Sequence, residues 1–510
     1  MPTVPQGLTT GMALQQQPTY SKSSAPQSSN QMPALQDAPG VQVTLQGEAR
    51  STSAYARPAP LPSQPASWTP DAISEQMQSN LSGRQRAGSN PLQRLTGMLF
   101  DRIASGSDSF EQSLARFGSL PNADRDLEHW VGGIGSARGS TTLQTLGFSL
   151  TTRSGTSVRI ELSHKLEPGF FSANSLAAKV SINGNLSDAE REALGEMSEL
   201  MERLAQEFMK TGKLTLDGLE GFDSDLFEKL KLDFRSGTDH YALTLNNTPE
   251  ERTLSINWNG NKVDLSLDLT GNTLTGAEAK AQSLAHYLEL IRDSVKKSDG
   301  DKALADFMAD SFATLHQLND TESRNATIAQ EKLPDNTLLT GMQDFSATFT
   351  SKYTQPNTHS EKFMERAGFT LELGQTSRVS GRPPIELSID QEQHYSLSAS
   401  YYRPLSFLED VDFETQTYQY IEINEQSTRR TQQRYEMGRW VSAIHTEENQ
   451  YHHQMTEYRL NDISRTVVKE DARARLLDLT EQTQQELYRN QQLALLDSLL
   501  LTAPTRRNLV

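Results

Sequence analysis

The stretch that decides the fold class is residues 254–267, which read LSINWNGNKVDLSL. Leucine, isoleucine and valine alternate with polar residues on both sides of Asn259-Gly260-Asn261. Alternation with period two is the pattern of a half-buried β-strand. Asn-Gly favours a tight hairpin turn because both residues tolerate positive φ. The stretch therefore predicts an antiparallel β-hairpin.

Residues 140–320 are expected to form a strand–helix–strand–helix module. Ser187-Asp188-Ala189-Glu190 and Thr275-Gly276-Ala277-Glu278 have the pattern of capping boxes, and each precedes apolar residues at helical spacing. A third helix is predicted from about Lys302. Alternating apolar residues predict further strands at residues 148–152, 158–162, 178–182 and 242–245.

Residues 339–510 are expected to form a β-rich module closed by a long C-terminal helix. Apolar and polar residues alternate at 345–349, 369–373 and 395–399, whereas residues 427–460 are polar and their strand pairing stays open. From about Lys469 to Leu501 the apolar spacing is helical, with Ala472, Leu476 and Leu479 in one stripe. The sequence thus predicts an α+β fold with two antiparallel-sheet modules packed with amphipathic helices, preceded by a disordered N-terminal arm.

The remaining segments are predicted to connect or precede these modules. Residues 1–90 are rich in Ser, Gln and Pro, a composition that buries too little apolar surface to offset the entropy of ordering. Residues 91–139 are expected to hold short helices, one after Asn90-Pro91 and one over Phe110–Phe117, and a Gly-rich loop. Residues 321–338 are predicted to be a polar linker.

Composition excludes several classes of function. The chain has 48 basic and 65 acidic residues, a net charge of −17, which disfavours nucleic acid as a partner. It has no cysteine, and therefore no disulfide, thiolate metal site or cysteine nucleophile. No apolar run reaches the roughly 20 residues of a membrane-spanning helix. The N-terminus lacks the pattern of a signal peptide, so a cytoplasmic location is expected, with secretion without a cleaved signal as the alternative.

No catalytic or cofactor-binding motif is present, and no cofactor is expected. Gly133-Ile134-Gly135-Ser136-Ala137-Arg138 lacks the third glycine and the preceding strand of a dinucleotide-binding loop. The chain contains no nucleophile elbow, no His-Glu-x-x-His and no phosphate-binding loop. An enzyme would therefore need an active site assembled from distant segments, and the sequence favours a protein that is not an enzyme.

One group of residues has the composition of a metal site. His445, Glu448 and His452 would share a face of a helix, and imidazole and carboxylate are ligands that divalent metals prefer. The neighbouring residues Asn449, Gln450 and Tyr451 are polar, and a solvated surface explains the group equally simply. The second interpretation is favoured, and no metal is expected.

Tyrosine and arginine are concentrated in residues 395–460. These two residue types are enriched at the energetic centres of protein–protein interfaces. The alternative is a tyrosine-bearing sheet face that the C-terminal helix covers. The interface candidates are Tyr418, Tyr420, Arg430, Arg434 and Tyr435.

The run from Phe148 to Phe208 resembles a strand–helix domain of unknown function found in uncharacterised bacterial proteins. The resemblance rests on the hairpin, the segment Val180-Ser181-Ile182-Asn183-Gly184-Asn185 and the helix after Ser187. It covers about an eighth of the chain. It implies a bacterial origin and no activity.

The function expected from these observations is that of a non-catalytic interaction or scaffold protein with an unknown protein partner. Two other classes stay open. One is a bacterial surface protein or effector secreted without a signal peptide, and the other is an enzyme whose active site has no sequence motif.

Overall fold

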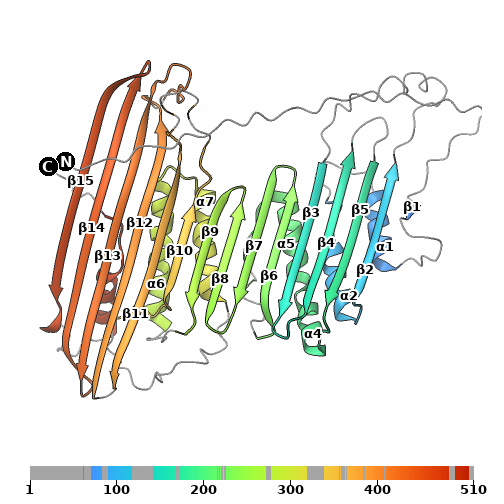
Figure 1. Cartoon of the computed structure of the whole chain (residues 1–510), viewed down its shortest axis with the longest axis horizontal. Helices are drawn as coiled ribbons and strands as arrows, with labels where there is room; N and C mark the ends of the chain where they lie inside the picture. Colours follow the sequence, from blue (N-terminus) through green and yellow to red (C-terminus); the bar gives the residue numbers. More distant parts are fainter. Residues whose placement is uncertain are drawn as a thin grey trace, which may run out of the picture. The chain divides into compact units, whose positions relative to one another are not determined.

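The computed structural model describes residues 61–62, 71–82, 90–117, 142–167, 173–270, 277–318, 338–481 and 489–504, with short gaps inside the ranges 173–270 and 338–481. These residues form one antiparallel sheet of fifteen strands (Figure 1). Its order is β1-β2-β5-β4-β3-β6, after which the strands follow chain order to β15. The strands are β1 (Leu61–Pro62), β2 (Ser109–Phe117), β3 (Thr142–Thr152), β4 (Ser157–Glu167), β5 (Ala173–Asn183), β6 (Phe227–Ser236), β7 (Asp239–Asn247), β8 (Glu251–Trp258), β9 (Asn261–Asp268), β10 (Phe345–Thr350), β11 (Gly368–Arg382), β12 (Glu386–Arg403), β13 (Tyr418–Glu436), β14 (Arg439–Arg459) and β15 (Asp462–Asp478).

The described helices pack against one face of this sheet. Helix α2 packs on β4, α5 on β6, α7 on β9 and α6 on β11, and Figure 1 shows them behind the strands. We call this the covered face and the opposite one the open face. The helices are α1 (Ala72–Ser82), α2 (Leu95–Ala104), α4 (Asp188–Glu196), α5 (Ser198–Thr211), α6 (Ala277–Lys297), α7 (Lys302–Gln317) and α9 (Arg489–Leu499).

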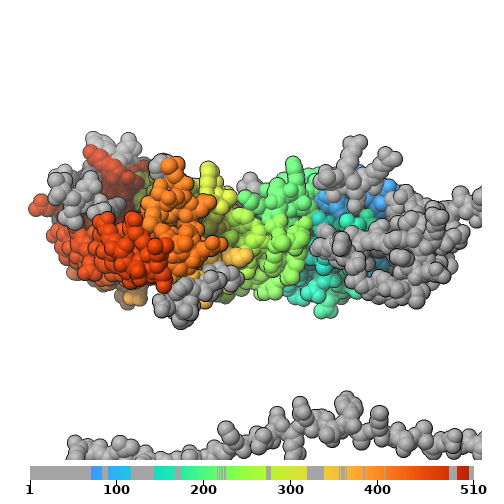
Figure 2. All heavy atoms as spheres, turned by 90° about the horizontal axis from the view of Figure 1, so that it is seen from above, coloured from blue at the N-terminus to red at the C-terminus, as the bar shows by residue number. Residues whose placement is uncertain are grey.

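The alternation of the strands places the core between the sheet and the helices. In β9, Val263, Leu265 and Leu267 are buried, while their neighbours Lys262 and Asp264 are exposed. The same alternation runs through β2 to β10, so that one continuous core extends under α2, α5, α6 and α7. In the space-filling view the colours change along the molecule in the same order as the strands of the sheet (Figure 2).

The prediction of two separate sheet modules is wrong. Strand β10 pairs with β9 on one side and with β11 on the other, so the sheet runs without interruption from the first predicted module into the second. The predicted linker 321–338 lies almost entirely outside the described residues. Alternation in sequence shows which side of a strand is buried, but it does not show which strand lies beside each edge.

Three further predictions of local structure are corrected. Phe110–Phe117 is strand β2, not a helix, and residues up to Asp478 of the predicted C-terminal helix form β15. In the described part that follows β15, residues 480–481 and α9 are helical. Residues 72–82 of the predicted disordered arm form helix α1, which buries Ile73, Met77 and Leu81. The rest of the arm, apart from Leu61–Pro62 and positions 71 and 90, and the Gly-rich loop at 133–138 lie outside the described residues.

The polar stretch 427–460 belongs to two long paired strands. Strands β13 and β14 are joined at Met437 and Gly438, which both have positive φ, as the tight turn of a hairpin requires. Thr431 is opposite His445, and Arg429 is opposite Glu447. Among the described residues, no helix is long and apolar enough to span a membrane.

Candidate functional site

Most buried polar side chains of the second half of the sheet lie on the covered face of β12–β14. In β13 every second residue from Ile423 points to this face, and the pattern changes there from apolar to polar. The inward residues that follow Ile423 are all buried: Glu425, Ser427, Arg429, Thr431 and Gln433. Buried polar groups are costly unless they find partners, so each one requires an explanation.

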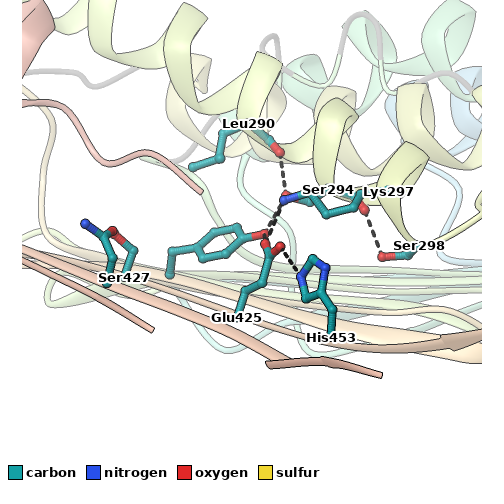
Figure 3. A network of polar contacts seen from close by, with 9 residues as sticks. Leu290, Ser294, Lys297, Ser298, Glu425, Ser427 and His453 are labelled. Atoms are coloured by element: carbon teal, nitrogen blue, oxygen red, sulfur yellow. Dashed lines mark hydrogen bonds and ion pairs between the residues drawn. The ribbon is translucent and has the colours of Figure 1, made fainter. Parts of the chain in front are cut away.

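Glu425 is the centre of the first cluster (Figure 3). Its side chain is 1 % exposed, and it accepts a hydrogen bond from Lys297 Nζ at 2.7 Å. His453 Nε2 lies 2.8 Å from the second carboxylate oxygen, and the Tyr395 hydroxyl donates at 3.0 Å. Ser294 on α6 donates to the Tyr395 hydroxyl at 3.2 Å. One carboxylate therefore connects α6 with β12, β13 and β14.

The electrostatics of this cluster keep Glu425 ionised. Burial alone would raise the pKa of the carboxyl, but the hydrogen bond with His453 and the charge of Lys297 outweigh it and hold the pKa below its usual value. Burial, with the neighbouring carboxylate, raises the pKa of Tyr395 far above its ordinary value, so this hydroxyl keeps its proton. At neutral pH the cluster is thus a carboxylate surrounded by donors.

A second cluster lies farther along the same face. Arg429 forms an ion pair with Glu447, and its second terminal nitrogen donates to Thr502 Oγ1 at 2.8 Å. His445 is fully buried and its Nδ1 lies 2.8 Å from Thr431 Oγ1. Burial, together with the nearby charges of Arg429 and Arg475, lowers the pKa of His445 to about 4, so the imidazole is neutral at pH 7.

Buried glutamines on the covered face bind the backbone of a segment that crosses β11–β13. Gln433 accepts from the Leu338 amide at 2.9 Å and donates to the Leu338 carbonyl at 3.1 Å. Gln391 accepts from the Thr340 amide at 3.2 Å, and Gln375 donates to the Met342 carbonyl at 3.0 Å. The glutamine side chains thus make the hydrogen bonds to this segment's backbone that a neighbouring strand would otherwise make.

These clusters have the properties of structural ties rather than of a reactive centre. A catalytic acid, base or nucleophile must reach a substrate, whereas the carboxylate of Glu425 is buried and takes three donors from its own chain. Within the described residues, no group of three or more His, Cys, Asp or Glu side chains is arranged to hold a metal ion. The arrangement can fix α6 and the C-terminal segment to the sheet.

The structure does not bring the three metal candidates together. They lie on strand β14, not on a helix, and residues separated by an odd number point to opposite faces of a strand. His445 is buried on the covered face, while Glu448 and His452 are on the open face, where His452 Nδ1 lies 3.5 Å from Glu470. The predicted helical spacing was therefore the wrong period for this segment.

The interface candidates have different surroundings. Tyr418 and Tyr435 are 0 % and 1 % exposed and offer no surface to a partner, and Tyr420 is also buried. Arg430 is on the open face and forms a two-pronged ion pair with Asp390 of β12. Arg434 is exposed and pairs with Glu436 on its own strand. The two arginines, and not the tyrosines, are on accessible surface.

Sequence reasoning missed the residues at the centre of the first cluster, Lys297, Tyr395 and Glu425. A usable signal was present at Glu425, because a charged residue stands where the alternation of Tyr420-Ile421-Glu422-Ile423 would place an apolar one. A buried carboxylate needs donors, and this need indicates a polar contact from the layer above. The pattern does not show that the donor is Lys297, which lies 128 residues away in the sequence.

Two shallow hollows lie on the open face of the described strands. One, of about 800 Å³, lies over β2–β6 and is lined by mixed charges that include Arg159, Glu161 and Lys231. The other, of about 560 Å³, lies over β12–β15 and is lined by residues that include Asn424, His452 and Glu470. Comparison with protein-family models, with curated proteins and with solved structures finds no match for this chain.

Proposed function

We propose that this chain is a non-catalytic interaction protein that binds a protein partner along the outer edge of β15. The observation that carries the proposal is the exposure of this 17-residue strand: every residue of it is exposed except Val467, Asp471 and Leu477, which are half-buried. β15 is the last strand in the sheet order, and no described strand pairs with its outer edge. An edge strand of this length presents a row of backbone donors and acceptors to another chain.

Apolar side chains on this strand add to the argument. Ile463, Val468 and Leu476 are 63 %, 48 % and 66 % exposed. In strand addition, the backbone hydrogen bonds supply affinity and alternate side chains supply specificity. The second hollow on the open face adjoins the same strand through Glu470 and Ala472, which extends the surface that a partner can contact.

The buried clusters support a role without catalysis. Their ionisable groups bind one another, and they join helix, sheet and C-terminal segment into one unit. A rigid sheet whose last strand is exposed is a suitable support for strand addition, since a preorganised edge loses little entropy on binding.

The experiment places a photo-crosslinking amino acid at Leu476 in the source cells. We expect covalent attachment of a protein at this position. The control places the same amino acid at Glu372, which is exposed on the open face of β11 and distant from β15 in the sheet order. Equal crosslinking at the two positions, or none at Leu476, would contradict the proposal.

A further inference from the structure

We infer that the partner of β15 is a second copy of the same chain, paired antiparallel about a two-fold axis that passes through Ala472. The inference rests on the proposed function, because it names the protein that occupies the edge. In such a pair, residues at equal distances before and after the axis residue lie opposite one another and point to the same face. The sequence of β15 can therefore be tested against each possible axis.

The charges on the covered face fit the axis at Ala472. Asp471 Oδ2 lies 2.5 Å from Arg473 Nε within one strand. The two-fold axis places Asp471 opposite Arg473 of the second copy, and Arg473 opposite Asp471 of the second copy. Two ion pairs thus become a square in which positive and negative charges alternate. Opposite charges across a strand pair are stabilising, and like charges are destabilising.

The apolar residues fit the same axis. Val468 on the open face lies opposite Leu476 of the second copy, and this contact occurs twice. Val467 on the covered face lies opposite Leu477 in the same way. In the unpaired chain Val468 and Leu476 are exposed, and the pairing covers both of these side chains. Cross-strand apolar pairs are the unit that stabilises a sheet.

Neighbouring axes do not fit. An axis at Glu470, Asp471 or Arg473 places that charged residue opposite itself, and an axis at Ala474 places Arg473 opposite Arg475. The axis at Ala472 has one unfavourable pairing, Lys469 with Arg475, which also occurs twice. Charged residues on an edge strand normally prevent pairing with other sheets. Here the charges disfavour the registers centred on residues 470, 471, 473 and 474. An axis at Val468 also avoids like charges, but it places Leu476 opposite Leu460, outside β15, and leaves the exposed Leu476 without the contact to Val468.

The contact is a single strand seam, smaller than the roughly 1,600 Å² of a standard stable interface. We therefore expect an equilibrium between monomer and dimer that depends on concentration. Sedimentation velocity of the full chain, from about 1 to about 100 µM, should show the weight-average mass rising towards that of a dimer.

The register is tested by single cysteines, which the chain lacks. In the Ala472→Cys variant the two thiols lie opposite each other, and Cα atoms of opposite residues are about 4.5–5.5 Å apart, within disulfide range. In the matched control, Ala474→Cys, the same exposed face carries the thiol, but the two cysteines are displaced by about 13 Å along the strands. Mild oxidation should link the first variant at least about tenfold faster than the second. Equal rates would overturn the register.

Charge exchange tests the same pairing without oxidation. Asp471→Arg and Arg473→Asp should each weaken dimerisation about tenfold or more, and the double variant should restore it, because the exchanged charges again alternate. Glu372→Arg makes the same change of charge on β11 and should leave the equilibrium unchanged. A double variant as weak as the single ones would overturn the inference.

The crosslinking experiment at Leu476 separates this inference from the proposed function. A product made of two copies of the chain supports both. A product with a different protein, from a chain that sediments as a monomer, supports the proposed function and overturns the inference. No product together with a monomer at every concentration overturns both.

Discussion

Lys297 Nζ lies 2.7 Å from Glu425 Oε2, and this contact joins the last turn of α6 to β13. The two residues are 128 positions apart in sequence. The Glu425 side chain is 1 % exposed, whereas that of Lys297 is 30 % exposed, so the lysine extends from the surface to a carboxylate that water hardly reaches. The pair therefore ties the helix layer to the sheet at a place where the covered face is polar.

Glu425→Gln is expected to destabilise the fold by about 2–4 kcal/mol at pH 7, because it removes a buried charge while Lys297 and His453 keep their positions beside it. The pKa of Glu425 is held below its usual value, so its contribution is present above the ordinary carboxyl pKa and is lost as pH falls through the folded value. The difference in free energy of unfolding between the native chain and the variant should therefore become smaller in acid. Urea unfolding of both proteins between pH 7 and pH 3 measures this difference.

Glu372→Gln is the matched control for this prediction. It makes the same chemical change at an exposed position on the open face of β11. Exposed substitutions of this kind usually change the free energy of unfolding by less than about 0.5 kcal/mol. Equal effects of the two variants would show that the buried contact does not stabilise the fold.

His445 is expected to make the fold less stable as pH falls from about 6.5 to about 4. Its pKa is lowered from 6.5 to about 4 in the fold, so in this range the unfolded chain binds a proton that the folded chain does not. The resulting loss is roughly 3 kcal/mol, at about 1.4 kcal/mol for each unit of pKa. In His445→Gln this loss is absent, and the difference in stability from the native chain should shrink towards pH 4.

His394→Gln controls for the loss of an imidazole as such. His394 is exposed on the open face of β12. Urea unfolding of both variants over the same range of pH compares them, and the difference from the native chain should shrink more for His445→Gln. Equal changes in the two variants would mean that burial does not hinder protonation of His445.

Local patterns of sequence predicted individual elements well. The stretch 254–267 forms β8 and β9, with positive φ at Asn259 and Gly260, and the capping box at Ser187 and Glu190 is present with both of its hydrogen bonds. These features depend on residues within a few positions of one another. The period of two and the chemistry of a cap can both be found at that range.

The predictions failed where distant contacts decide the structure. Ala472 and Leu476 have helical spacing, yet they lie on the open face of β15 because β14 supplies a complete partner strand. Strand β10 connects two predicted modules because both of its edges are paired. The cluster at Glu425 depends on a lysine that another element supplies. The pattern of a single sequence indicates which face of an element each residue lies on. It does not indicate which residue of another element packs against that face.

Gln433→Met is expected to release the segment at Leu338 from the sheet. The glutamine satisfies both the amide and the carbonyl of Leu338 and accepts a bond from the Tyr435 hydroxyl at 2.9 Å. Methionine has a similar volume but leaves these buried groups without partners, at a cost of about 1–3 kcal/mol for each unsatisfied group. Hydrogen exchange of the Leu338 amide should accelerate at least about tenfold.

Gln432→Met distinguishes this effect from a general loss of strand stability. Gln432 is the neighbouring residue on the same strand, but it is exposed on the open face, where its Nε2 donates to Asp390 at 3.4 Å. The exchange rate at Leu338 should stay at the native value in this variant. If both variants accelerate exchange at Leu338 equally, the stability of strand β13 as a whole controls the opening of the segment. If neither variant does, the glutamine hydrogen bonds do not hold the segment on the sheet.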